Sequence, residues 1–564
     1  MMAGIATAAD ETILEKAKRG DAAAQLEIGI MYGKGDGVPK DIIEAARWIQ
    51  KAADQGLPRA EFNLGTMYEN GDGVSKDSLK AVGWYRKAAD QGLAVAQHNL
   101  GVMLADGNGV PRDSVEAAKW YRKAADQGFA TSQYNLGVMS STGEGVPRDS
   151  AEAVKWYRKA SDQGFAPAEY NLGVVLATGE GVPKDSVEAV TWYRKAAEQN
   201  NTPAQYNLAV MFETGEGVPK GSAEAVKWYR KAAENGNTAA QYNLAVTLQN
   251  GDGVAKDNTE AANWYLKAAE KGMAQAQYKL GAMLAIGDGI PKDMTEAVRW
   301  YRNAATQGLG AAQYDLGVVY RDGDGVPKDS ADAVKWFRKA AAQDLALAQF
   351  NLGVMLADGN GVPRDSVEAA KWYRKAADQG YASAQYNLGL LFFNGDGVPK
   401  DRAEAVKWFH KAADQGIALA QYNIGVILVS GDGVPKNRGE AMKWYRRAAD
   451  QGLASAQYDL GVMFANGDGV PKDSAEAVKW YRKAATQGIA PAQYSLGIMF
   501  ANGDGVPIDE IEGLAWTNIA AASGFQGAIG NKKVLENRLS PEATLAAQRR
   551  SEEIVRELET SKVP

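Results

Sequence analysis

The chain has 564 residues and a formal net charge of −6, with 69 acidic and 63 basic side chains, so it has no basic surplus for binding nucleic acid or an anionic membrane. It contains no cysteine, which excludes disulfides, thiolate metal sites and thiol nucleophiles. Hydrophobic residues make up 45% and charged residues 23%, values typical of a soluble folded chain. No apolar run approaches the roughly 18 residues that an integral membrane segment needs.

The first residues bear on the cellular compartment. The stretch MMAGIATAADET lacks the basic region and the apolar region of a secretory signal, so a cytoplasmic protein is the default expectation. The string Ala6-Thr7-Ala8 resembles the end of a cleavage site. The alternative is therefore a periplasmic or exported protein that keeps the remnant of a truncated signal.

A repeat of 36 residues organises most of the chain. The segment at 99–128, NLGVMLADGNGVPRDSVEAAKWYRKAADQG, recurs unchanged at 351–380, which is 252 residues or seven steps of 36 later. All fourteen tryptophans, from Trp48 to Trp516, occupy one position of this repeat without any insertion or deletion. Such a period indicates a solenoid, in which each repeat stacks on its neighbours.

Each repeat is predicted to contain two helices. The first has apolar residues at helical spacing, as in SQYNLGVM at 132–139. A loop of the form G-D-G-V-P-K follows, because glycine and proline interrupt helices. The second helix opens at an aspartate such as Asp113, and Glu116 three residues later completes a pattern typical of a capping box. The second helix ends at a glycine such as Gly128.

Two substitution patterns support this interpretation. The glycine that ends the second helix is replaced only by Asn200 and Asp344, the residue types that best tolerate a left-handed conformation. The first helix carries a mid-helix glycine, such as Gly101, replaced only by Ala209 and Ala245. Because glycine costs about 1 kcal/mol relative to alanine in a helix, its retention indicates that another helix approaches closely.

The repeat resembles two known helical repeats. Its L-G pair and alanine-rich second helix resemble the tetratricopeptide repeat, whose period is about 34. The two extra residues and the phrase A-x-x-W-Y-x-K-A-A-x-x-G, as at 153–164 and 477–488, are more similar to the Sel-one-like repeat family. RLSPEATLAAQ at 538–548 is similar to the closing segment of many bacterial members. The resemblance implies an all-α, right-handed superhelical α-solenoid that acts as an adaptor or scaffold in protein complexes.

Three regions follow from this interpretation. Residues 1–20 are expected to form an N-terminal capping helix, and residues 21–524 to form fourteen tandem repeats. Residues 525–564 are expected to form C-terminal capping helices, because the charges of the repeat are lost in the last unit and Ser540-Pro541 begins a further helix. We expect the protein to be monomeric.

The sequence does not indicate catalysis, a metal site or a cofactor. The two histidines, His98 and His410, occupy positions that hold Tyr, Phe or Arg in most other repeats, and they cannot build a Ser-His-Asp or zinc site. The acidic loop that begins at Asp322 lacks the oxygen ligands and the glycine of an EF-hand. Neither nucleotide-binding glycine motif is present. We therefore expect a protein that is not an enzyme.

The candidate binding surface is a ladder on the first helices. By analogy with tetratricopeptide repeats, the residue before the L-G pair would face the concave groove, and it is mostly asparagine, whose amide can pair with the backbone of an extended peptide. The preceding residue is mostly tyrosine, which adds amphipathic contact area. The alternative is that Asn bonds a neighbouring helix or loop and that Tyr packs between repeats. The predicted peptide-binding residues are Asn63, Asn99, Asn135, Asn171, Asn207, Asn243, Asn351, Asn387, Asn423, Tyr134, Tyr170, Tyr206 and Tyr242.

The expected function is a non-enzymatic scaffold that binds a protein or an extended peptide in its concave groove. Nucleic acid is not expected as a partner, because the chain is acidic overall. Two alternatives stay open. One is a structural spacer without a groove ligand, which the near-uniform repeats would suit. The other is a cell-envelope module that binds glycans through the tyrosines.

Overall fold

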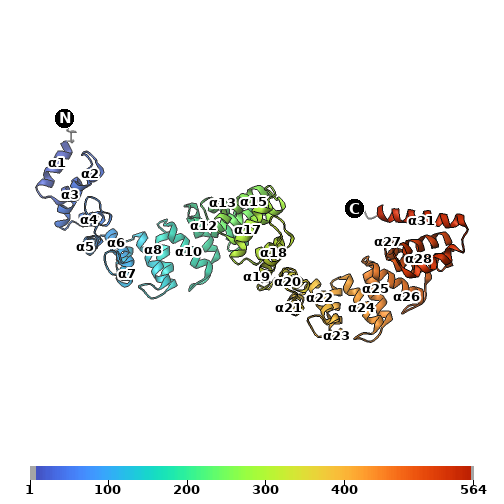
Figure 1. Ribbon diagram of the computed structural model, residues 1–564. Helices are drawn as coiled ribbons and strands as arrows, with labels where there is room; N and C mark the ends of the chain where they lie inside the picture. Colours follow the sequence, from blue (N-terminus) through green and yellow to red (C-terminus); the bar gives the residue numbers. More distant parts are fainter. Residues whose placement is uncertain (1–7, 561–564) are drawn as a thin grey trace. The chain divides into compact units, whose positions relative to one another are not determined.

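The computed structural model describes residues 8–560, and their side chains from residue 13 onward. This part of the chain forms 31 α-helices and no strand, which confirms the all-α class. The Ala6-Thr7-Ala8 string lies outside the described residues, apart from the backbone of Ala8 at the start of α1 (Ala8–Lys18). Figure 1 shows the helices following one another in chain order.

The chain divides into two compact units, Met1–Pro291 and Lys292–Pro564. The boundary falls between α16 and α17, the two helices of the eighth repeat. Within each unit the helices are arranged as stacked pairs, a first helix followed by a second helix, as in a solenoid.

The first helices begin 36 residues apart, so the repeat positions used below are counted from their first residue. The first helices are α2 (Ala22–Lys34), α4 (Pro58–Asn70), α6 (Ala94–Asp106), α8 (Ala130–Thr142), α10 (Ala166–Thr178), α12 (Thr202–Thr214), α14 (Thr238–Asn250), α16 (Ala274–Ile286), α18 (Gly310–Asp322), α20 (Ala346–Asp358), α22 (Ala382–Asn394), α24 (Ala418–Ser430), α26 (Ala454–Asn466) and α28 (Ala490–Asn502). The second helices are α3 (Ile42–Asp54), α5 (Ser78–Asp90), α7 (Ser114–Asp126), α9 (Ser150–Ser161), α11 (Ser186–Glu198), α13 (Ser222–Glu234), α15 (Asn258–Glu270), α17 (Met294–Thr306), α19 (Ser330–Ala341), α21 (Ser366–Asp378), α23 (Arg402–Asp414), α25 (Arg438–Asp450), α27 (Ser474–Thr486) and α29 (Glu510–Ala522).

The expected aspartate caps are confirmed, but the capping box is wrong. Asp113 Oδ1 accepts from the backbone N–H of Glu116 at 2.8 Å. The Asp113 N–H, which a capping box would pair with the glutamate, instead donates to the Leu104 carbonyl of the first helix. The Glu116 carboxylate instead accepts from the indole N–H of Trp120 at 3.3 Å and from the guanidinium of Arg86 at 2.7 Å. In this repeat the glutamate orients the tryptophan rather than the cap.

The glycine predictions are confirmed. Asn200 and Asp344 have φ of 64° and 60°, in the left-handed region that glycine adopts at the same position of other repeats. At the mid-helix Gly101, an added Cβ would lie 2.7 Å from the ring of Tyr121. The close approach that the sequence predicts is therefore the approach of a second-helix aromatic ring, at position 28 of the repeat, to the first-helix backbone.

A ladder of buried glutamines joins consecutive repeats. Gln97, which is 4% exposed, donates to the Ala89 carbonyl at 3.1 Å. Its own carbonyl accepts from Gln127 at 2.8 Å, and Gln127 also donates to the Gly92 carbonyl at 3.0 Å. Because each glutamine ties one repeat to the next, the ladder satisfies polar groups that the stacking buries.

Three helices lie outside the fourteen pairs. The helix α1 precedes α2, and Ala17 packs in a small core with Trp48. After α29 come α30 (Gln526–Glu536) and α31 (Pro541–Thr560). Ala547 and Ile554 of α31 are buried against the last repeat.

Candidate functional site

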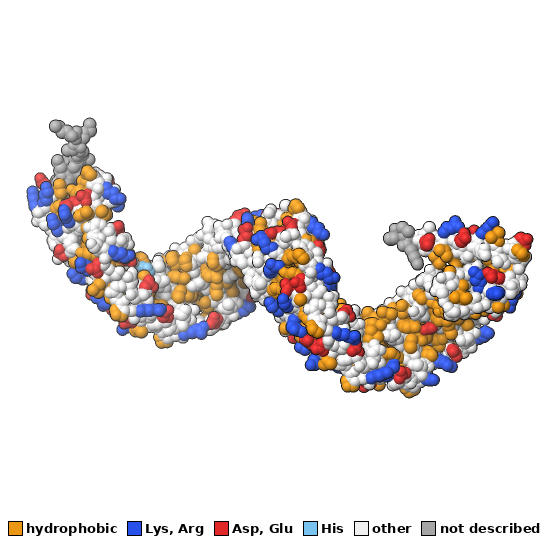
Figure 2. All heavy atoms as spheres, in the orientation of Figure 1, with side chains coloured by type: hydrophobic (Ala, Val, Ile, Leu, Met, Phe, Trp, Pro, Cys, Tyr) orange, Lys and Arg blue, Asp and Glu red, His pale blue; other side chains and the backbone are white. Residues whose placement is uncertain are grey.

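One face of the first helices stays partly accessible in every unit. We call it the first-helix face and define it by positions 5, 6, 9 and 12 of the repeats. In α8 these are Tyr134, Asn135, Val138 and Ser141, all half-buried beside a buried leucine and methionine. Figure 2 shows hydrophobic side chains gathered around α10 in one unit and around α24 in the other.

The predicted tyrosines pack on the second helix of their own repeat. The rings of Tyr134 and Tyr157 are tilted, with their centroids 6.1 Å apart. The same arrangement joins Tyr170 to Tyr193, Tyr206 to Tyr229 and Tyr242 to Tyr265. One side of each tyrosine at position 5 is thus committed to packing, which leaves less ring area for stacking on a sugar.

Six of the nine predicted asparagines meet the hydroxyl of the tyrosine at position 28 of the preceding repeat. Asn171 Nδ2 donates to Tyr157 Oη at 3.4 Å. Burial raises the pKa of Tyr157 to about 12, and the amide contact opposes this shift. Equivalent contacts join Asn99 to Tyr85, Asn135 to Tyr121, Asn207 to Tyr193, Asn243 to Tyr229 and Asn387 to Tyr373. The amides therefore lie on the first-helix face with one hydrogen-bonding group engaged by the protein.

The remaining predicted asparagines have other surroundings. Asn351 donates to the Leu347 carbonyl and accepts from Arg321 Nη1, both at 2.8 Å. Asn423 contacts the hydroxyl of Tyr386. Asn63 lines a cavity in the first unit.

In some repeats position 12 adds a further polar group beside the phenol, and the sequence analysis did not identify this position. The Tyr85 hydroxyl donates to Glu69 Oε2 at 2.6 Å, and the Tyr265 hydroxyl donates to Gln249 Oε1 at 3.1 Å. The position varies widely among otherwise similar repeats, and this variation is the signal that could have identified it. Its occupants are Gly33, Glu69, Ala105, Ser141, Ala177, Glu213, Gln249, Ala285, Arg321, Ala357, Phe393, Val429, Ala465 and Ala501.

A carboxyl group replaces the asparagine in the thirteenth repeat. Asp459 accepts a hydrogen bond from the Tyr422 hydroxyl, and burial raises the pKa of this aspartate above its ordinary value. The same environment and the nearby carboxylate raise the pKa of Tyr422 to about 12. The local polarity of the first-helix face therefore differs from one repeat to another.

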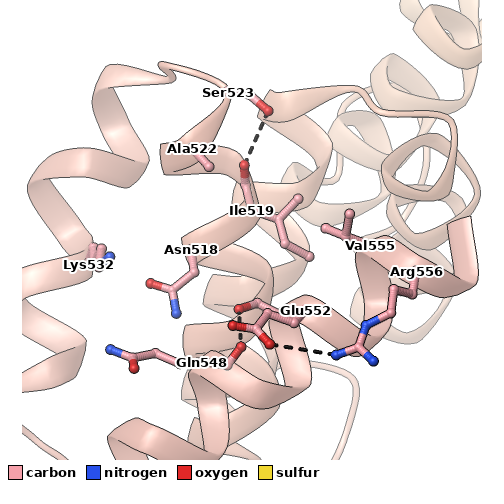
Figure 3. A pocket seen from close by; sticks show the side chains of 10 residues that line it. Asn518, Ile519, Ala522, Ser523, Lys532, Gln548, Glu552, Val555 and Arg556 are labelled. Atoms are coloured by element: carbon pink, nitrogen blue, oxygen red, sulfur yellow. Dashed lines mark hydrogen bonds and ion pairs between the residues drawn. The ribbon is translucent and has the colours of Figure 1, made fainter. Parts of the chain in front are cut away.

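A larger cavity of about 740 Å³ lies among α29, α30 and α31. Asn518 stands where most repeats carry an arginine, and its side chain lies toward Lys532 and Gln548 (Figure 3). Its Oδ1 has no hydrogen-bond partner. On the far wall Arg556 pairs with Glu552 at 3.6 Å. This cavity is the seam left where α31 crosses the last repeat.

Both histidines have packing roles. His98 contacts the rings of Tyr121 and Phe129, and burial lowers its pKa. His410 packs edge-on against Trp444. The described residues contain no group of three or more His, Cys, Asp or Glu side chains suited to a metal ion. None of their helices is both long and apolar enough to cross a bilayer.

Comparison with known proteins identifies the repeat. The Sel1 repeat model matches fourteen consecutive segments over residues 22–525. Among solved structures, the chain is similar to a protective antigen of uropathogenic Escherichia coli displaying an SLR fold, with 36% identity, a TM-score of 0.70, and coverage of 79% of this chain and 97% of that one.

A Sel1 repeat protein from Oxalobacter formigenes is also similar, with 34% identity, a TM-score of 0.46, and coverage of 58% of this chain and 93% of that one. Among curated proteins, none matches the chain. The fourteen matched repeats and the Escherichia coli relative show that the chain belongs to the Sel1 repeat family.

Proposed function

We propose that the protein is a non-enzymatic scaffold that binds an extended segment of a partner protein along the first-helix face. Sel1 repeats form a tetratricopeptide-like solenoid, a fold commonly used for protein–protein interaction. Stacked repeats create extended surfaces on which a chain can lie. The observation that carries the proposal is the recurring contact between an asparagine at position 6 and a buried phenol, beside a position 12 that varies from repeat to repeat.

The geometry supports both affinity and discrimination. Each of the six amides that contact a position-28 phenol keeps further hydrogen-bonding capacity, because an asparagine side chain offers two donors and an acceptor. The half-buried valines at position 9, such as Val138, give apolar area beside it. A repeated backbone-binding element with a variable neighbour suits a peptide that is held by its main chain and read by its side chains.

The spacer alternative accounts less well for position 6. A spacer places no demand on a partly exposed face, so its residues would vary freely, as position 12 does from glycine to arginine and phenylalanine. Position 6 nevertheless keeps asparagine in nine of the fourteen repeats. The glycan alternative loses support because the tyrosine rings at position 5 pack against second-helix rings.

A bead-displayed library of random dodecapeptides tests the proposal. The wild-type protein is compared with a variant in which Asn135, Asn171, Asn207 and Asn243 are changed to Ala. The control changes three exposed second-helix lysines, Lys119, Lys155 and Lys227, to Ala. Circular dichroism and thermal unfolding establish that every variant stays folded.

We expect the wild type and the lysine variant to retain a common set of peptides that the asparagine variant loses. If the asparagine variant retains that set, the peptides bind somewhere other than the first-helix face. Failure of the wild type to retain any peptide would favour the spacer.

A further inference from the structure

The first repeat departs from the others at two positions that meet on the first-helix face. Position 28 is Ile49 there, whereas the next twelve repeats carry Tyr or Phe. Position 12 is Gly33, the only glycine at that position. The first repeat therefore lacks both the aromatic ring at position 28 and any side chain at position 12.

A cavity of about 380 Å³ results. Ile49 takes the place of the ring, and its Cγ1 lies 2.6 Å from a Cβ built on Gly29, but it extends no further toward the surface. At Gly33 an added Cβ would meet nothing closer than Ala45 Cβ at 3.7 Å, so space is left where other repeats have a side chain. The volume of this cavity lies within the range of about 300–1,000 Å³ that is typical of small-ligand pockets.

The walls of this cavity are apolar and one end is acidic. Ile30, Ile42, Ile49 and Phe62 line it. The Glu69 carboxylate, which also lines it, accepts from the Tyr85 hydroxyl at 2.6 Å.

The ionisable groups of the lining leave a net negative charge. Glu69 and Asp72 are acidic, and Lys34, exposed in the last turn of α2, is the single basic residue of the lining. Glu69 forms no ion pair with any described residue. A half-buried carboxylate beside an apolar hollow therefore lacks a cationic partner.

We propose that this cavity, which we call the first-repeat pocket, holds a lysine or arginine side chain of the bound segment. The inference rests on the proposed peptide-binding function. The methylene stem of either side chain would lie along the isoleucines and Phe62, since long basic side chains bury their stems against apolar surface. The cationic head would reach Glu69, because charge-assisted hydrogen bonds are the stronger ones.

In the eleventh repeat a residue at position 12 already packs against a cationic side chain of this protein. There Phe393 occupies the place of Gly33, and the guanidinium of Arg402 lies 3.7 Å from the centre of its ring. The ring of Phe393 also packs against Phe409, with centroids 6.4 Å apart. The chain thus contains the filled counterpart of the pocket, and Gly33→Phe copies it into the first repeat.

A second variant removes the charge alone. In the seventh repeat the phenol of Tyr265 already bonds a glutamine, Gln249, at position 12. Glu69→Gln reproduces this pair in the second repeat, so it should keep the fold and the Tyr85 contact while removing the carboxylate.

The test sorts the dodecapeptide library on four proteins, namely the wild type, Gly33→Phe, Glu69→Gln and the control Ala105→Phe. The control makes the same bulky change at position 12 of the third repeat, where Tyr121 is present. Bound peptides are sequenced, and one lysine- or arginine-containing peptide is measured against its norleucine analogue.

We expect wild-type peptides to share a basic residue at one position, and the norleucine analogue to bind about tenfold more weakly, equivalent to ~1.4 kcal/mol. Both pocket variants should still bind peptides but lose this difference, and Ala105→Phe should keep it. Peptides bound without a basic preference, or a preference that persists in Gly33→Phe, would overturn the pocket and leave the proposed function intact. Absence of peptide binding by the wild type would overturn both.

Discussion

The first and last repeats lose the same aromatic ring with opposite results. Position 28 is Ile49 in the first repeat and Thr517 in the last. In the first repeat the loss leaves the first-repeat pocket. In the last repeat Thr517 is fully buried, and its hydroxyl donates to the Gly513 carbonyl at 2.8 Å.

The difference lies at position 24, one helical turn before the lost ring. The last repeat has Gly513 there, where the other repeats have alanine. A Cβ on Gly513 would lie 2.8 Å from the Gly497 carbonyl oxygen and 2.9 Å from Ala501 N, so the backbones of α28 and α29 touch directly. The first repeat keeps Ala45, and a Cβ on Gly29 would lie 3.1 Å from the Ala45 carbonyl oxygen, compared with 2.7 Å between a Cβ on Gly497 and the Gly513 carbonyl oxygen. The missing ring therefore leaves a hollow in the repeat whose two helices approach each other less closely.

The largest expected effect concerns the tryptophan at position 27, which both terminal repeats keep. Trp48 and Trp516 are 8% and 3% exposed. Changing either to Ala should destabilise its repeat by about 3–5 kcal/mol, because transfer and cavity costs add. Hydrogen exchange in α3 and α29 measures the local loss, with exposed Lys119→Ala as the control. Unchanged exchange would show that position 27 does not anchor the terminal repeats.

Placing a tyrosine at position 28 should change the stability of the first and last repeats by different amounts. Thr517→Tyr forces a ring between closed helices and should cost about 1–3 kcal/mol, the usual cost of overpacking. Ile49→Tyr should be close to neutral, because Gly29 offers the same approach that Gly65 offers Tyr85. Urea unfolding of both variants measures the contrast. Equal costs would mean that the first-repeat pocket is not open space.

A smaller change probes the same spaces with one methyl group. Gly513→Ala should destabilise by about 1–2 kcal/mol, because the clash outweighs a helix-propensity gain of about 1 kcal/mol. Gly33→Ala meets only ordinary contacts and should stabilise by up to about 1 kcal/mol. Thermal unfolding measures the stability change of each variant. A stabilised Gly513→Ala would contradict the direct contact between the backbones of α28 and α29.

The smallest effect depends on pH and concerns the glutamine ladder beside the first repeat. Glu61 occupies position 4 of the second repeat, and Gln493 occupies the same position of the last repeat. Both side chains are 3% exposed. Burial raises the pKa of Glu61, although the charge of Lys87 and a hydrogen bond from Gln91 oppose the shift. The folded state therefore binds the proton more tightly than the unfolded state, and the stability contribution of Glu61 falls as pH rises.

Glu61→Gln should consequently raise the melting temperature at pH 7, and this gain should shrink as pH falls toward the ordinary glutamate pKa of about 4.3. Gln493→Glu should show the reverse at pH 7. Melting curves from pH 4 to pH 8 test both. A gain for Glu61→Gln that is the same at every pH would exclude ionisation as its cause.

Much of the repeat could be predicted from sequence because its signals are local. Asp113 as a helix cap, the left-handed Asn200 and Asp344, and the close approach at Gly101 all follow from residue type and spacing. The role of Glu116 could not be predicted, because it depends on the Leu104 carbonyl already holding the Asp113 N–H.

The candidate site was predictable only in part. The asparagine and tyrosine positions could be identified, but their partners belong to other helices, as when Asn171 meets Tyr157. The first-repeat pocket required knowing that positions 12 and 28 of one repeat adjoin Glu69 of the next. Such neighbours are set by stacking, which a local pattern does not reveal.

Photo-crosslinking tests the central claim, binding on the first-helix face, most directly. A library-selected peptide is added to two forms of the full chain that carry p-benzoylphenylalanine, one in place of Ala177 at position 12 and one in place of the exposed second-helix Lys155. We expect the form with the photo-crosslinker at position 177 to attach the peptide, and excess unlabelled peptide added before irradiation to prevent this crosslink. Attachment by the Lys155 form alone would contradict it.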